Sequence, residues 1–238
     1  MTGKRIESAV EAIARVQSGQ TIMVGGFGLV GAPLTLIDAL VDHSDATDLT
    51  IVSNNIGEPG RGLGKLLRQG RILRGIGSYF TSNPEAVAAV NSGWIEATLL
   101  PQGTFAEAIR AGGAGIGGFY TPVGAGTLLA EGKESRVIDG VPHVLERPLR
   151  ADIALVYADR GDELGNLWYR RTARNFNPVM ATAGRVTIAE VEHLVEPGAI
   201  DPDHIHTPGI YVQRILLGQK FEKRIEQRTL RKREAATA

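Results

Sequence analysis

Hydrophobic positions in the first hundred residues follow two kinds of pattern. Short β-branched runs predict buried strands, whereas longer segments with apolar residues three and four positions apart predict amphipathic helices. The expected strands are residues 21–24, 49–53, 71–80 and 95–101. The helical segments that alternate with them are residues 33–43, 62–70, 81–93 and 104–112. This order predicts an α/β fold, a mostly parallel sheet with crossover helices on both faces.

Individual helices carry stripes and caps that support this interpretation. The apolar stripe expected for 33–43 is Leu34, Ile37, Leu40 and Val41. Asn83 is expected to cap the helix expected within 81–93, with Pro84 at its first position. The N-terminal segment MTGKRIESAVEAIARV places Ile6, Val10 and Ile13 on one face. Because it carries acidic residues and no apolar core, we expect the first helix of the fold rather than a targeting signal.

The pattern changes after about residue 111. Residues 111–127 hold seven glycines among seventeen positions, which predicts a loop rather than a regular element. A small hairpin is expected next, with its turn at Asp139-Gly140. Strands are then expected at 151–158, 185–192 and 209–217, with a helix at 177–184. Without a linker or an internal repeat, we expect one domain over residues 1–238. Its charged C-terminal tail, 219–238, is either a solvated end or an arm on a partner subunit.

Composition excludes several classes of function. The 238 residues carry 26 basic and 26 acidic side chains, so the formal net charge is zero, which argues against a nucleic-acid-binding protein. The chain has no cysteine, so disulfides, thiolate metal sites and cysteine nucleophiles are impossible. This composition fits a reducing compartment, and we expect a cytoplasmic protein. No apolar stretch approaches the roughly 20 residues that span a bilayer, and the histidines form no metal-binding pattern, so neither a membrane nor a metal is expected.

A glycine-rich segment follows the first expected strand. Residues 26–31 satisfy G-x-G-x-x-G, the spacing of a dinucleotide-binding loop. However, Asp48 precedes the second strand, whereas a ribose-binding acid lies at that strand's carboxyl end, and Phe27 would crowd a pyrophosphate. No G-K-[ST] follows, which excludes a Walker loop. From these residues alone, a tight strand-to-helix turn and a ligand-binding loop remain alternatives.

Polar side chains follow two further strands. Asn54 and Asn55 come after the second strand and Gln102 after the fourth, where parallel strands present their carboxyl ends to ligands. Amides suit a carboxylate or a thioester oxygen, although a turn or a helix cap would also explain the asparagines. Thr104 and Glu107 are expected to form a capping box. The convergence of three strand ends favours a small-molecule site.

No nucleophile is evident beside this surface. The chain lacks a G-x-S-x-G elbow, and Glu131, Glu146 and Glu190 are expected to be ordinary exposed or strand-edge residues. The sequence therefore predicts a binding surface without its own attacking group.

Longer segments resemble the A (alpha) subunit of family I coenzyme A transferases. The similar segments are SGQTIMVGGFGLVGAP, SNNIG, LLPQGTFAEAIRAGGAG, GGFYTPVGAGT, GNLWYRRTARNFNPVM and HTPGIYVQRIL, and the similarity runs in order from about residue 5 to 233. Ser18 departs from the family pattern, which has Asp or Asn at that position.

The resemblance implies a ping-pong transfer of CoA. A glutamate in an E-N-G context, on the B subunit, would attack the acyl-CoA thioester and pass through an anhydride to a glutamyl-CoA thioester. This chain has no E-N-G, so no catalytic residue is expected in it, and the CoA thioester is a substrate rather than a cofactor. The resemblance implies an A2B2 heterotetramer with the B subunit. The residues expected to line the substrate site are Gly25, Gly26, Phe27, Asn54, Asn55, Gln102, Gly112 and Gly113.

Several functions stay open at this point. The expected reaction moves CoA from an acyl-CoA to a 3-oxoacid such as acetoacetate. Succinyl-CoA is the expected donor. The alternatives within the family are transfer to 3-oxoadipate and exchange between acetate or butyrate and acetoacetate. An α/β ligand-binding protein without catalytic activity is the alternative from another class. A further alternative, an NAD(P)-dependent oxidoreductase, is supported only by the G-x-G-x-x-G spacing.

Overall fold

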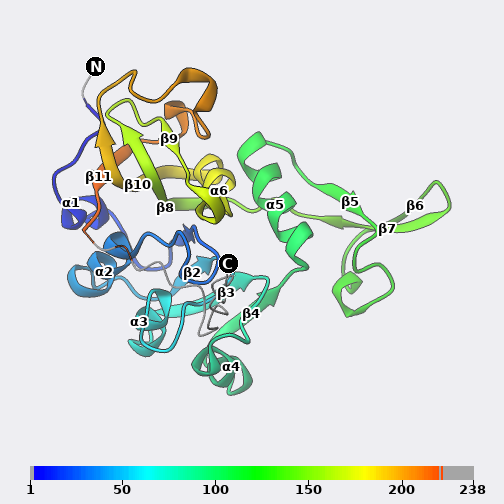
Figure 1. The fold of residues 1–238 in the computed structure, drawn as a ribbon. Helices are drawn as coiled ribbons and strands as arrows, with labels where there is room; N and C mark the ends of the chain where they lie inside the picture. The colour runs from blue at the N-terminus through cyan, green and yellow to red at the C-terminus, as the bar shows by residue number, and fades with distance from the viewer. Residues whose placement is uncertain (1–2, 220, 222–238) are drawn as a thin grey trace, which may run out of the picture.

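A single twisted sheet forms the centre of the molecule. The computed structural model describes residues 3–219 and residue 221. Within them, the main sheet has eight strands in the order β11-β10-β8-β1-β2-β3-β4, with β9 paired to β8 (Figure 1). All pairs are parallel except β8 with β9. The strands are β1 Thr21–Val24, β2 Leu49–Val52, β3 Ile72–Gly77, β4 Glu96–Leu99, β8 Ala151–Asp162, β9 Leu167–Trp168, β10 Gly184–Val195 and β11 Arg214–Leu217.

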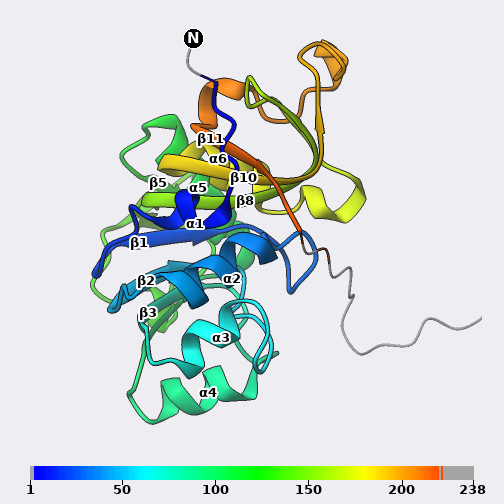
Figure 2. The same cartoon turned by 90° about the vertical axis from the view of Figure 1, so that its left-hand side faces the viewer.

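Helices cover both faces of this sheet, as the sequence predicts. One face carries α1 Ala9–Ile13, α2 Leu34–His43, α3 Leu63–Arg68 and α4 Pro84–Asn91 (Figure 2). The other carries α5 Gln102–Ala114 and α6 Asn177–Ala183. Each set of helices has its own hydrophobic core against the sheet: Ile37 and Leu66 lie in the first, and Phe105 and Met180 in the second. The fully buried Ile22 and Met23 of β1 contribute to opposite cores, which explains the uninterrupted apolar run of this strand.

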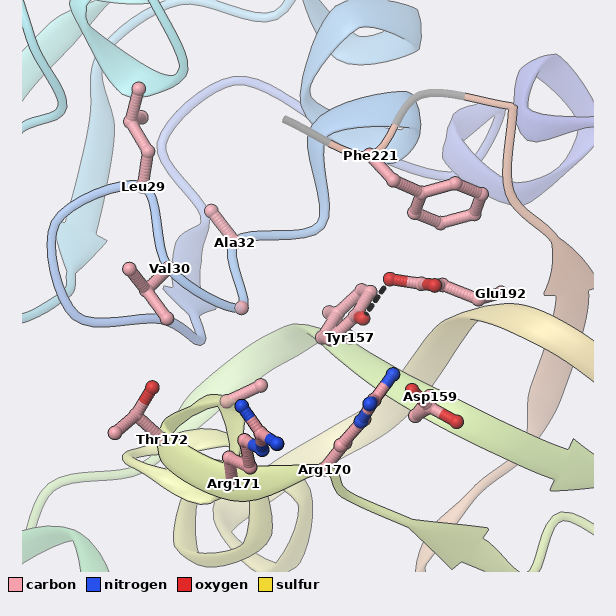
Figure 3. A pocket seen from close by; sticks show the side chains of 12 residues that line it. Leu29, Val30, Ala32, Tyr157, Asp159, Arg170, Arg171, Thr172, Glu192 and Phe221 are labelled. Carbon is pink, nitrogen blue, oxygen red and sulfur yellow. Dashed lines mark hydrogen bonds between the residues drawn. The ribbon is translucent and has the colours of Figure 1, made fainter. Parts of the chain in front are cut away.

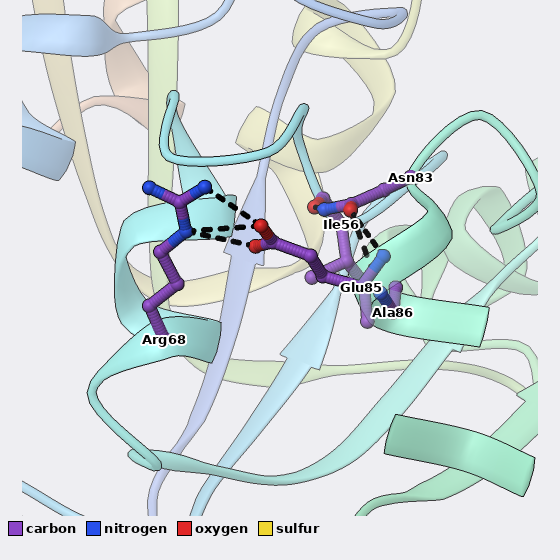
Figure 4. A network of polar contacts seen from close by, with 5 residues as sticks. All are labelled: Ile56, Arg68, Asn83, Glu85 and Ala86. Atoms are coloured by element: carbon purple, nitrogen blue, oxygen red, sulfur yellow. Dashed lines mark hydrogen bonds and ion pairs between the residues drawn. The ribbon is translucent and has the colours of Figure 1, made fainter. Parts of the chain in front are cut away.

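The Asn83 cap is confirmed, and it also anchors a neighbouring loop. Asn83 Oδ1 accepts the N–H groups of Glu85 at 3.0 Å and Ala86 at 3.4 Å. Its Nδ2 donates to the Ile56 carbonyl at 2.8 Å (Figure 4). Arg68 and Glu85 pair at 2.7 Å and join α3 to α4. The start of α4 therefore holds the loop that follows β2, the segment that carries Asn54 and Asn55.

The expected N-terminal helix is wrong in its extent. Ser8 caps a helix of only five residues, and Val10 is 44% exposed. Ile6 is buried outside the helix, where its N–H donates to the Ile215 carbonyl at 2.9 Å. Residues 4–6 thus extend along β11 instead of joining α1, since a backbone partner distant in sequence satisfies them there.

The capping box at Thr104 and Glu107 is also wrong. Pro101 occupies the cap position, so α5 begins at Gln102 and Thr104 is buried inside the helix. Glu107 pairs with Arg110 at 2.6 Å instead of returning to the helix start. A proline is well suited to precede a helix because it has no N–H to satisfy.

The glycine-rich segment 111–127 is only partly a loop. Helix α5 continues through Gly112 and Gly113 to Ala114, and the capping residue Gly115 has a left-handed φ of 75°. A Cβ atom at Gly112 would lie 1.8 Å from the Leu149 carbonyl oxygen, and one at Gly113 would lie 2.1 Å from Thr182 Oγ1. These glycines therefore allow α5 to pack closely. The segment also includes β5 Phe119–Thr121 and leads to the 3-10 turn η1 Leu128–Ala130.

A second, three-stranded sheet projects beyond α5 (Figure 1). Its order is β5-β7-β6, with β6 Ser135–Ile138 and β7 Val141–Glu146. The predicted turn is confirmed, because Asp139 and Gly140 both have positive φ, 48° and 77°. That pair of values is the backbone of a tight two-residue hairpin.

Apart from Gln219 and Phe221, the charged tail expected at 219–238 lies outside the described residues. The remaining 3-10 turns are η2 Arg171–Arg174, η3 Pro202–His204 and η4 Gly209–Tyr211. In the described part of the chain, no helix has the length and apolar character needed to cross a membrane.

Candidate functional site

The strand order of the main sheet reverses between β1 and β8. From β1 the chain adds β2, β3 and β4 on one side, and later β8, β10 and β11 on the other. Ligands of open α/β sheets bind at the carboxyl ends of the strands beside such a reversal. A cavity of about 280 Å³ lies there, between the loop that follows β1 and the residues of η2 (Figure 3).

Residues 25–31 follow β1, and we call them the glycine loop. This loop is a tight turn with two unused hydrogen-bond donors. Phe27 and Val30 exchange backbone hydrogen bonds of 3.0 and 3.2 Å, and the Gly25 N–H donates to the Leu155 carbonyl at 2.9 Å. Within residues 3–219, the N–H groups of Gly26 and Gly28 donate to no acceptor. Gly26 has a φ of 116°, which a side chain would not tolerate.

Three consecutive residues at the start of α6 hold this loop, and we call Asn175–Asn177 the clasp. Asn175 Nδ2 donates to the Val30 carbonyl at 3.0 Å, and Asn177 Nδ2 donates to the Gly31 carbonyl at 2.9 Å. Phe176 stacks on Phe27, with ring centroids 6.4 Å apart and planes within 9°. The clasp therefore fixes both the backbone and the exposed ring of the loop.

The clasp was not among the residues singled out from the sequence. Its contacts with the loop bridge about 145 positions of chain, so no local pattern points to them. The available signs are the family-like segment GNLWYRRTARNFNPVM, which contains the clasp, and the placement of two asparagines around a helix start, directly before Pro178.

Asn54 and Asn55 lie beside the glycine loop, but both are buried. Asn54 Nδ2 donates to Ser78 Oγ at 2.9 Å, which ties it to the end of β3. Asn55 Oδ1 accepts the Gly57 N–H at 3.0 Å, so the turn alternative holds for its oxygen. Asn55 Nδ2 donates to no acceptor within the described residues, and it would lie 3.9 Å from a Cβ atom on Gly28. Asn55 thus adds a third donor next to the loop.

Aromatic contacts connect the helix that begins at Gln102 to the glycine loop. It is the first residue of α5 and is exposed at the carboxyl end of β4. Phe105, one turn further along α5, packs on Phe176 at 5.2 Å, and Phe176 in turn stacks on Phe27. The start of α5 is therefore attached to the clasp, and Gln102 belongs to the same edge of the sheet as Gly25, Gly26, Phe27 and Asn55.

The structure does not bring Gly112 and Gly113 together with these residues. Both line a separate hollow of about 470 Å³ with Thr21, Ala151 and Gly184. Each of the latter is the first residue of its strand, so this hollow lies at the amino edge of the sheet, opposite the switch point.

Polar groups from β8, β10 and η2 line the cavity at the switch point. The Tyr157 hydroxyl donates to the Glu192 carboxylate, and burial together with this bond raises the pKa of Tyr157. Asp159 lies beside them on β8, and Arg170 and Arg171 lie on the facing segment (Figure 3). The pattern along the chain does not single out these five residues, because they come from β8, β10 and the start of η2, and only the fold brings these elements together.

Two acids expected to be exposed or at a strand edge are buried. Glu146 is 6% exposed and pairs with Lys133 at 2.7 Å. Glu190 is fully buried, and its Oε2 accepts the Leu36 N–H at 2.9 Å. Burial raises the pKa of Glu190 to about 8, against hydrogen bonds from Leu36 and Thr35 that lower it. Glu190 supports the start of α2 and does not line the cavity.

The histidine pair near residue 205 serves the fold. His206 Nδ1 accepts the Tyr169 N–H at 3.0 Å, and its ring stacks on Tyr169. In the described part of the chain, no three His, Asp or Glu side chains gather as a metal-binding set.

Comparison with known proteins shows the family to which the chain belongs. The family model described as "Coenzyme A transferase" matches residues 6–218. The chain belongs to the coenzyme A transferase family. This membership favours the CoA-transferase interpretation of the glycine loop over the dinucleotide interpretation.

Two curated relatives are similar over almost their whole length. The A subunit of the succinyl-CoA:3-ketoacid coenzyme A transferase of Xanthomonas campestris is 55% identical over 229 residues, covering 96% of this chain and 94% of the relative. The A subunit of a probable succinyl-CoA:3-ketoacid coenzyme A transferase of Bacillus subtilis is 52% identical over 228 residues, covering 96% and 95%.

A solved structure shares the fold. The acyl-CoA transferase of Escherichia coli, in a thioester complex with CoA, superposes with a TM-score of 0.82 at 21% identity. The alignment covers 93% of this chain and 48% of the solved chain, so this chain spans about half of that protein.

Proposed function

We propose that this chain is the non-nucleophilic subunit of a heteromeric CoA transferase that moves CoA from succinyl-CoA to a 3-oxoacid such as acetoacetate. The names of the two curated relatives support the substrates and the division into subunits. The family resemblance supports a partner, the B subunit, that carries the attacking glutamate, and an A2B2 assembly. The reaction needs no cofactor, since the CoA thioester is itself a substrate.

The proposed reaction has four balanced steps. The partner's glutamate carboxylate attacks the acyl carbon, forming a mixed anhydride and releasing the CoA thiolate. The thiolate attacks the glutamyl carbonyl, forming the glutamyl-CoA thioester and releasing succinate. The carboxylate of the 3-oxoacid then displaces the thiolate to form a second anhydride. The thiolate finally attacks the 3-oxoacyl carbonyl, which yields the new CoA ester and regenerates the glutamate.

The observation that carries the proposal is the group of unused donors beside the glycine loop. The N–H groups of Gly26 and Gly28 and Asn55 Nδ2 have no acceptor among the described residues. Each step of the reaction passes through a tetrahedral centre with a negatively charged oxygen, and preorganised donors stabilise such an oxygen. The clasp keeps the loop in place before the substrate arrives, so no reorganisation is needed during the reaction.

The experiment is a reconstitution with the B subunit. CoA transfer from succinyl-CoA to acetoacetate is measured for the isolated chain, for its isolated partner and for the co-purified complex. We expect activity only in the complex, and mass spectrometry should find CoA attached to the partner in the presence of succinyl-CoA alone. Full activity of the isolated chain, or CoA attached to it, would contradict the split site. Acceptor tests with 3-oxoadipate, acetate and butyrate separate the alternatives within the family.

A further inference from the structure

We propose that the cavity at the switch point binds the free carboxylate of a dicarboxylic acyl group through Arg170 and Arg171. This inference rests on the proposed function and adds how the enzyme selects its succinyl donor. A 3-oxoacid such as acetoacetate has one carboxylate, which is the reacting group. A succinyl group has a second carboxylate that must be placed somewhere during the reaction.

The size of the cavity suits a small acid. Its volume of about 280 Å³ is just below the range of roughly 300–1,000 Å³ for small-molecule pockets. Leu29, Val30 and Ala32 give one wall an apolar surface, which fits the methylene groups of a short acyl chain. The nucleotide part of CoA would need more room.

Two arginines supply the positive charge. Arg170 and Arg171 line the cavity and are both exposed, and neither forms an ion pair with another described residue. A guanidinium group matches a carboxylate with two parallel hydrogen bonds. Arg171 also has a φ of 51°, a left-handed backbone that favours glycine. Strain of this kind concentrates where a side chain must be aimed at a ligand.

The acidic residues of the cavity restrict where an anion can lie. Glu192 already accepts the Tyr157 hydroxyl, and Asp159 lies 3.8 Å from Arg160 Nε. Figure 3 shows Arg171 and Thr172 on the side away from Asp159, with Arg170 between. A carboxylate would therefore bind on the Arg171 side, where the Thr172 hydroxyl offers a further donor.

The cavity and the glycine loop form one rigid unit. Val30 and Gly31 line the cavity, and the clasp holds both of their carbonyl groups. The clasp follows η2 directly, so Arg171 and the free N–H groups of the loop have a fixed separation. A substrate with two carboxylates can use both ends of this unit, whereas a monocarboxylate uses only the end with the free N–H groups.

The test compares four substrates on the reconstituted complex. KM is measured for succinyl-CoA, acetoacetyl-CoA, succinate and acetoacetate in the wild type and in Arg170→Gln, Arg171→Gln and Arg174→Gln. Arg174 is the matched control, since it has the same charge, lies in the same turn and does not line the cavity. Losing a charged hydrogen bond should raise KM for succinyl-CoA and succinate by about 10- to 100-fold in the cavity variants. KM for acetoacetyl-CoA and acetoacetate should stay within about twofold.

Other outcomes overturn the proposal in recognisable ways. A rise in KM confined to the two CoA esters would mean that the arginines bind CoA. Failure of the variant chain to co-purify with the B subunit would mean that the arginines hold the two subunits together. An equal change for all four substrates, or a matching change in Arg174→Gln, would indicate a general structural role. A wild-type complex that transfers CoA between none of these substrates would refute the proposed function itself, before any variant is considered.

Discussion

Asn177 Oδ1 fills the space that a side chain on Gly25 would need. A Cβ atom on Gly25 would lie 1.9 Å from that oxygen, far inside van der Waals contact. The oxygen cannot easily move, because it accepts the Tyr157 N–H at 2.9 Å while Asn177 Nδ2 donates to the Gly31 and Ala173 carbonyls. The glycine after β1 and the asparagine at the start of α6 therefore fix each other's position.

The first prediction concerns this contact. Gly25→Ala should lower the free energy of unfolding by roughly 1–3 kcal/mol, the usual cost of overpacking a rigid site. Urea denaturation followed by circular dichroism measures the change. Gly117→Ala is the control, because a Cβ atom there meets nothing within 4 Å, and its effect should stay within about 0.5 kcal/mol. Equal values for the two variants would show that Asn177 yields to the added methyl group.

The second prediction concerns the amide of Asn177. Asn177→Asp keeps the oxygen that accepts the Tyr157 N–H but turns a second oxygen toward the Gly31 and Ala173 carbonyls. We expect a loss of roughly 1–3 kcal/mol per unsatisfied buried group, with a fall in kcat of the reconstituted complex. Asn91→Asp, exposed at the end of α4, adds the same charge away from the site. Wild-type kcat in Asn177→Asp would separate the clasp from the reaction.

Local signals in the sequence account for much of the fold. The β-branched run of β1, the stripe of α2 and the Asp139-Gly140 turn each depend on neighbouring residues, so the sequence predicts them, although the stripe omits the fully buried Leu36. The failure at Thr104 has a local cause, whereas the failure at Val10 has a distant one. In the first, Pro101 moves the start of α5, and in the second, the chain before Ser8 pairs with β11 instead of continuing the helix.

The site was harder to predict because its contacts bridge long stretches of chain. Gly25, Gly26 and Asn55 could be placed at strand ends from the β-α-β rhythm alone. Asn177 could not, since its partner Gly31 lies 146 residues away. Glu190 looked like an ordinary acid because the N–H that it accepts belongs to Leu36, 154 residues earlier. The role of Gly113 likewise depends on Thr182, which the pattern of loops and turns does not reveal.

The third prediction tests Gln102 as a donor in the reaction. Gln102→Ala should lower kcat by about 10²- to 10³-fold, the usual cost of losing one oxyanion donor. The side chain is exposed and makes no hydrogen bond with another described residue, so the thermal midpoint and the assembly with the B subunit should not change. Gly103→Ala is the neighbouring control, because a Cβ atom there meets nothing within 4 Å. Wild-type turnover in Gln102→Ala would remove Gln102 from the site.

The fourth prediction is a pH dependence of stability that arises at Glu190. Burial raises the pKa of this carboxyl to about 8 from its ordinary 4.5, so the folded protein holds a proton that the unfolded chain releases. Its contribution to stability is complete below pH 4.5 and is lost as the pH rises toward 8, by up to about 1.4 kcal/mol per pH unit. Glu190→Gln keeps an oxygen for the Leu36 N–H and cannot ionise. Urea unfolding at pH 5, 6.5 and 8.5 should therefore show the wild type losing stability relative to Glu190→Gln as the pH rises. The wild type should keep a constant difference in stability from the exposed Glu131→Gln control at all three pH values. A constant difference from Glu190→Gln as well would mean that Glu190 is ionised in the fold.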